Sequence, residues 1–127
     1  PGAIEVNAKY ENMKDLYKNT VIAEKDTLIH ILGSEIIPRC YEQLKSFAGQ
    51  NSSKVLSEYS ESFVKIFESI IVRLKYIKQW ESTDDLNVLS RLREYLNETC
   101  EVTNEILDYI PKKESWPEFE DFMEIYD

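Results

Sequence analysis

The sequence predicts an all-α protein, an up-and-down bundle of four to five helices that forms a single domain over residues 1–127. Only three Gly and four Pro occur among its 127 residues, so few positions interrupt a helix. Apolar residues recur every three or four positions, and Val, Ile and Thr never alternate with polar residues for long. A chain of this length can bury a hydrophobic core without disulfides or metal ions.

The first predicted helix covers residues 4–32, where apolar residues keep helical spacing and nothing would break the helix. Gly33 fits the left-handed position that ends a helix, and Ser34 fits the cap of a second helix over residues 35–49. Pro38 falls at the fourth position of that helix, where its missing N–H would lack an intrahelical acceptor in any case. The sequence therefore predicts that the first helix ends at Gly33.

The third predicted helix follows a loop at residues 49–52 and runs from a cap at Ser52 or Ser53 to about residue 81. Its apolar arc is wide, so we expect it to be the central and most buried helix. The same width would fit a core that continues into another chain, in which case the sequence is a fragment of a larger helical array. Residues 82–85 carry a capping signature for the fourth helix, which Pro111 ends.

A fifth helix is predicted over residues 115–127, which open with a capping box at Ser115 and Glu118. The segment is acidic, and its large apolar side chains fall on one helix face, which must be buried against another surface. Either it packs on the groove between the third and fourth helices, or it docks into a hydrophobic groove with a basic rim on another protein. The candidate partner-binding residues are Trp116, Phe119, Phe122, Met123 and Tyr126.

A second candidate for partner binding is the basic cluster Arg73, Lys75 and Lys78, near the end of the third helix. Cations at this position complement the helix dipole and usually line a solvated face. The functional alternative is a docking site for an acidic partner or a lipid headgroup.

The charge and hydropathy patterns argue against several classes of function. A net charge of −9 disfavours non-specific nucleic-acid binding, which requires clustered Lys and Arg. No apolar run approaches the roughly 18 residues of a membrane span. No signal segment is visible and the two cysteines have no redox spacing, so we expect a cytoplasmic protein.

The inventory of catalytic groups is small, and we expect neither an enzyme nor a bound cofactor or metal. His30 is the only histidine, so the usual sets of metal ligands are missing. Cys40 and Cys100 have no metal-ligand spacing, and scattered glycines cannot form a phosphate-binding loop. These observations favour a non-catalytic protein–protein interaction module, a helical adaptor or scaffold domain that is a subunit of a multi-protein complex.

Three alternatives remain open. In a secreted four-helix signalling factor, Cys40 and Cys100 would pair. A small acidic bundle with one histidine also resembles a histidine phosphotransfer domain. That family places Lys and Gly third and fourth after the histidine, whereas Gly33 stands third after His30 and the phosphate-stabilising Lys is absent. A homodimer could form through an apolar stripe on the fourth helix made of Leu89, Leu92 and Leu96.

Overall fold

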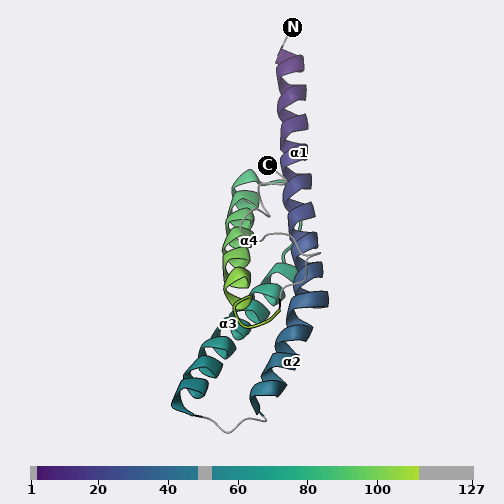
Figure 1. The fold of residues 1–127 in the computed structure, drawn as a ribbon. Coiled ribbons are helices and arrows are strands. Elements are labelled where there is room, and N and C mark those ends of the chain that lie inside the picture. The colour runs from purple at the N-terminus through teal and green to yellow at the C-terminus, as the bar shows by residue number, and fades with distance from the viewer. Residues whose placement is uncertain (1–2, 49–52, 112–127) are drawn as a thin grey trace.

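The computed structural model describes residues 3–48 and 53–111, which are all-helical and form a bundle (Figure 1). The predicted helical bundle is thus confirmed for this part of the chain. Its elements are α1 (Ala3–Ile31), the π turn η1 (Leu32–Ile36), α2 (Ile37–Ala48), α3 (Lys54–Lys78) and α4 (Leu86–Ile106). The helix predicted over residues 115–127, with its five candidate residues, lies outside the described residues.

The elements form an antiparallel bundle in which α1, η1 and α2 follow one path, α3 returns beside it, and α4 runs in the direction of α1 (Figure 1). The α4 helix packs against both α1 and α3, and α2 packs against α3. The first part of α1 projects beyond the start of α4 (Figure 1). None of the described helices is long and apolar enough to span a membrane.

The predicted helix end at Gly33 is wrong. The backbone stays helical through η1, and Gly33 does not adopt a positive φ. Instead, the amide of Ile37 donates to the carbonyl of Leu32, five residues earlier. This wider turn directly precedes Pro38, which lacks an N–H and whose ring clashes with the carbonyl four residues back in a regular α-helix. The π turn therefore lets one helical path continue where the sequence predicted a cap and a new start.

The π turn also keeps the core face in register. Leu28, Leu32, Ile36 and Cys40 are all fully buried although they follow one another at intervals of four residues. Four residues rotate an α-helix by about 400°, so such positions drift by about 40° per step. A wider turn offsets this drift, and the four side chains stay directed at α3 and α4.

The α3 helix contacts α1, η1, α2 and α4, as expected of a central helix, but the expectation that it is also the most buried helix is wrong. More residues are buried on α4 than on α3. At the start of α3, Leu56 and Tyr59 remain about two-fifths exposed. Leu89, Leu92 and Leu96 are buried in the core of this one chain, so they cannot form the predicted dimer stripe. The buried apolar residues are Val21, Leu28, Leu32, Ile36, Cys40, Phe63, Phe67, Ile70, Leu74, Ile77, Leu89, Leu92, Leu96, Cys100, Ile106 and Ile110.

An aromatic cluster closes the end of the bundle near the connection from α2 to α3. The ring of Tyr59 lies 5.7 Å from that of Phe47 and 4.7 Å from that of Tyr109. Phe63 contacts the same two rings, at 5.5 and 5.6 Å between centroids. These contacts fix the chain after α4 beside the first part of α3.

Candidate functional site

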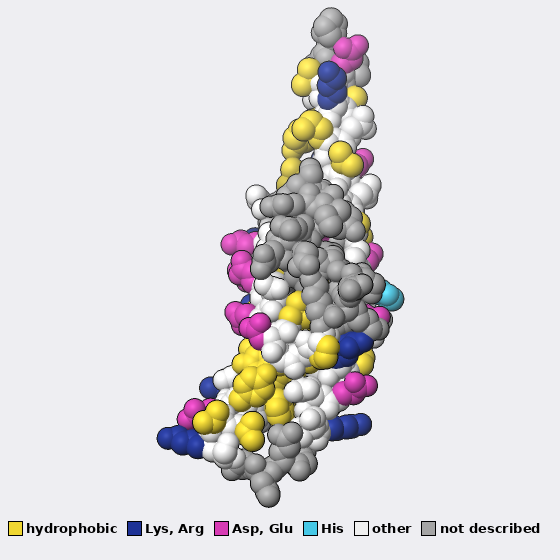
Figure 2. Space-filling model, in the orientation of Figure 1, with side chains coloured by type: hydrophobic (Ala, Val, Ile, Leu, Met, Phe, Trp, Pro, Cys, Tyr) yellow, Lys and Arg dark blue, Asp and Glu magenta, His cyan; other side chains and the backbone are white. Residues whose placement is uncertain are grey.

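The most exposed apolar face among the described residues lies on the projecting part of α1. Val6, Tyr10 and Met13 are 67%, 56% and 70% exposed, and the half-buried Tyr17 continues their row. Figure 2 shows hydrophobic side chains along this part of the helix. We call the row Val6, Tyr10, Met13 and Tyr17 the α1 stripe.

The α1 stripe lies on the same face of the helix as the core residues that follow it. The spacings from Tyr17 to Val21, and from Val21 to the buried Leu28, are four and seven residues, so all three side chains point the same way. Farther along α1 this face is covered by α4, whereas the stripe lies at or beyond the first turn of α4 (Figure 1). The stripe is therefore an extension of the core face without a neighbouring helix in the described structure.

An open apolar groove of about 360 Å³ lies where the α1 stripe meets the start of α4. Its walls are Tyr10, Met13, Lys14, Tyr17, Leu86 and Ser90. A groove of this shape beside an exposed helix face is suited to the apolar face of another helix, which is a common mode of peptide recognition.

The connection that precedes α4 is held in place by two neighbouring aspartates. The Asp85 carboxylate accepts hydrogen bonds from the amides of Asn87 and Val88, at 2.9 and 3.4 Å, and so caps α4. The Lys18 ammonium lies 2.6 Å from the Asp84 carboxylate. A hydrogen bond from Lys18 and its positive charge lower the pKa of Asp84 below its usual value. The Asp85 cap and the Lys18–Asp84 ion pair together fix where α4 begins relative to the α1 stripe.

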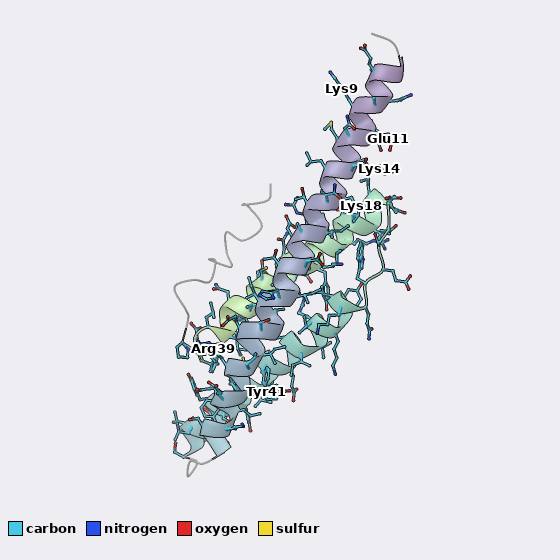
Figure 3. All side chains as sticks on the ribbon, turned by 90° about the vertical axis from the view of Figure 1, so that its right-hand side faces the viewer. Lys9, Glu11, Lys14, Lys18, Arg39 and Tyr41 are labelled. Carbon is cyan, nitrogen blue, oxygen red and sulfur yellow. The ribbon has the colours of Figure 1, made fainter. Side chains whose placement is uncertain are left out.

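Lysines border the α1 stripe on both sides. Lys9 and Lys14 lie about 70° from the centre of the stripe around the helix axis, whereas Glu5, Glu11 and Asp15 lie about 110° or more from it. Figure 3 shows Lys9 and Lys14 on opposite sides of α1. Lys14 also lines the groove. The stripe thus has a lysine on each flank of α1, and the charge of Lys14 also acts on Asp84 at the start of α4, where it helps to lower the pKa of that carboxyl.

A buried ion pair fastens α1 to α4 just below the groove. The Glu24 side chain is fully buried, and its Oε1 lies 3.2 Å from the Arg93 guanidinium, which also stands over the ring of Tyr17 at 6.0 Å. The other carboxylate oxygen has no hydrogen-bond partner among the described residues. Burial raises the pKa of Glu24, and the charge and hydrogen bond of Arg93 oppose that rise.

The three residues of the predicted basic cluster have different surroundings. Arg73 is half-buried against α4, where its guanidinium lies 3.2 Å from the Thr99 hydroxyl and 4.8 Å from the centre of the Tyr95 ring. Lys75 and Lys78 are exposed on α3. Successive residues of an α-helix are rotated by about 100°, so Lys75 and Lys78 each lie more than a third of a turn around α3 from Arg73. Arg73 is therefore engaged in helix packing, and partner binding by the cluster stays a prediction.

The other candidate reactive groups are separate from the α1 stripe. His30 is exposed, and its Nδ1 lies 3.5 Å from the Ser34 hydroxyl. Cys40 and Cys100 are buried free thiols, and burial raises the pKa of each to about 12. They are not paired as the signalling-factor alternative requires. Among the described residues, no group of three or more His, Cys, Asp or Glu side chains is placed to hold a metal ion.

Comparisons with protein families, with curated proteins and with solved structures find no match to this chain.

The apolar spacing of the α1 stripe predicts a helix but does not indicate whether that face of the helix is covered. What the spacing does not contain is where α4 begins. Asp84, just before α4, pairs with Lys18 in the middle of α1, so the residues of α1 before Lys18 extend past the start of α4.

Proposed function

We propose that the chain is a non-catalytic protein–protein interaction module that uses the α1 stripe as its docking face. A single observation carries the proposal: Val6, Tyr10 and Met13 continue the core face of α1, yet each is more than half exposed. Burying a side chain of this size stabilises an association by roughly 1.5–3 kcal/mol, so a partner that covers the stripe gains substantial affinity.

The geometry favours a helical partner. The stripe spans eleven residues, or about 17 Å of helix, and ends in the apolar groove beside Leu86. An amphipathic helix could lie along it, as in other helix-in-groove complexes. The rim formed by Lys9 and Lys14 favours acidic residues on that partner and would steer their encounter. Such a module would act as an adaptor or scaffold domain within a larger assembly.

The cytoplasm is the proposed location of this module. Cys40 and Cys100 are both unpaired and buried, which is typical of proteins from a reducing compartment. The exposed Lys75 and Lys78 remain candidates for a separate contact on α3.

The test begins with a photo-crosslinking residue at position 13 of the full chain, in cells that express the protein. A matched probe replaces the exposed Lys65 on α3. We expect a partner that cross-links from position 13 and not from position 65. That partner is then identified, purified and titrated against variants.

Two valine variants make the titration specific. Val6 and Val55 are 67% and 74% exposed, and both lie in the first turns of their helices. Val6→Asp should weaken binding at least tenfold, about 1.4 kcal/mol, whereas Val55→Asp should leave it within twofold. A partner that binds Val6→Asp as tightly as the natural chain would overturn the proposal, as would equal cross-linking from both positions.

A further inference from the structure

We propose that a second copy of this chain occupies the α1 stripe, through the acidic segment formed by residues 115–127. Each copy would insert its acidic segment into the partner's groove, so that the dimer contains two equivalent contacts. This inference rests on the proposed function of the stripe as a docking face.

The two surfaces are complementary in charge. The acidic segment contains five acidic residues and no Lys or Arg. On α1 itself, the charged side chains nearest the stripe are Lys9 and Lys14, one on each side (Figure 3). An acidic helix laid along the stripe would therefore bring opposite charges together on both flanks.

The apolar rows also match in length. On the helix that the sequence predicts for the acidic segment, the row from Trp116 to Tyr126 spans ten residues, or about 15 Å. The α1 stripe from Val6 to Tyr17 spans eleven residues, or about 17 Å. Aromatic anchors of this kind supply most of the affinity in helix-in-groove contacts.

The position of Pro111 favours a second copy over the same chain. Tyr109 packs on Tyr59, at the end of the bundle opposite the groove. From there, α4 alone extends for 21 residues, about 30 Å, back to Leu86. Four extended residues add about 14 Å and a helix to Tyr126 adds about 17 Å, so Tyr126 of the same chain only draws level with Leu86. Val6 lies beyond the groove, and the segment's other aromatic residues would stand short of Leu86, so the same chain could not cover the whole stripe.

Direct pairing of two α1 stripes is disfavoured by their own rim. If two copies packed antiparallel with Tyr10 opposite Met13, Lys9 would share one flank with Lys9 of the other copy, and Lys14 would share the other flank with its Lys14. Such twofold contacts repeat every unfavourable pair, so like charges would meet on both sides. If the acidic segment of the second copy occupies the stripe instead, its carboxylates face these lysines and the repulsion is absent.

Two bundles that lie side by side in opposite directions satisfy both contacts at once. The end of α4 in one copy then stands beside the α1 stripe of the other, and a twofold axis makes the exchange reciprocal. A single contact with one short helix is small, but two contacts in one dimer double the buried area.

The test uses full-length variants and sedimentation equilibrium over two decades of concentration. The natural chain should shift from its monomer mass of 15.0 kDa towards twice that value. Met13→Asp, and separately the double variant Trp116→Ala with Phe119→Ala, should each weaken self-association at least tenfold. Asn12→Asp introduces the same charge on the opposite face of α1 and should associate like the natural chain.

Mixing the two defective variants provides the decisive experiment. Met13→Asp retains its acidic segment, and the double variant retains its stripe, so together they can form one intact contact. We expect a mixed dimer, weaker than the natural one because one of its two contacts is lost, and weakened further by salt.

Specific outcomes would overturn the inference. A natural chain that stays at monomer mass at every concentration would contradict it, as would a Met13→Asp variant that dimerises normally or a mixture that fails to associate. If the chain is monomeric but an identified partner still requires Val6, the docking function stands and only the second copy is excluded.

Discussion

The two halves of α1 carry the same pattern of apolar residues but differ in burial. In the second half, Val21 and Leu28 are fully buried against the bundle, whereas Val6 and Met13 in the first half are about two-thirds exposed. Helical periodicity determines which face a residue occupies, but the position at which the neighbouring helix begins determines whether that face is covered. The uncovered half of an otherwise regular core face is the basis for the proposed docking function.

The sharpest contrast between the two halves is expected in stability. Leu28→Ala should lower the free energy of unfolding by about 3 kcal/mol, because it opens a cavity in the core. Met13→Ala should change it by less than about 0.5 kcal/mol, because Met13 is 70% exposed. Urea denaturation of both variants at high dilution, where the chain is monomeric, measures the difference. Equal losses would show that the first half of α1 is buried in solution.

A smaller effect is expected from the ion pair at the boundary between the two halves. Because burial raises the pKa of Glu24, its contribution to stability is fully present below the ordinary Glu value of 4.5 and is lost as pH rises through the raised pKa. The natural chain should therefore lose stability relative to Glu24→Gln as pH rises above about 4.5. Denaturation at a series of pH values tests this, and a constant difference would contradict it.

The smallest effects concern the start of α4, which limits the covered part of α1. Asp85→Ala removes the cap of α4 and should cost about 1 kcal/mol. Its neighbour Asp84 is exposed and pairs with Lys18 at the surface, so Asp84→Ala should cost less, and salt should reduce that cost further. Thermal denaturation of both variants at two salt concentrations distinguishes the loss of the cap from the loss of the ion pair. An equal loss from both variants would show that capping does not fix the start of α4.

The parts of the fold that depend on local signals could be predicted from the sequence. Ser53 accepts a hydrogen bond from the amide of Leu56 at 3.2 Å and caps α3, and Asp85 caps α4 within the predicted signature. The continuous path through Gly33 could not be predicted from a helix-stop rule. Two sequence signals are present around Gly33: core residues spaced by four positions, and Pro38. A π turn accommodates both of them.

The candidate site was harder to predict, because it depends on what lies beside each helix. Arg73 and Lys75 are neighbours in the sequence, yet the structure turns Arg73 towards Thr99 on α4 and leaves Lys75 exposed. The apolar spacing of Tyr10 and Met13 was visible, but its exposure follows from where α4 starts. Which face of a helix is covered depends on how the helices pack together, and the spacing of residues along one helix does not reveal this.

The α1 helix is covered along its second half and open along its first half. Amide hydrogen exchange of the full chain at high dilution measures this difference directly, with residues 24–32 as the internal standard. We expect slow exchange over residues 24–32 and fast exchange over residues 6–13, where the helix has no neighbour. Equal protection of both stretches at high dilution would mean that the α1 stripe is already covered within one chain, and would rule out an open docking face.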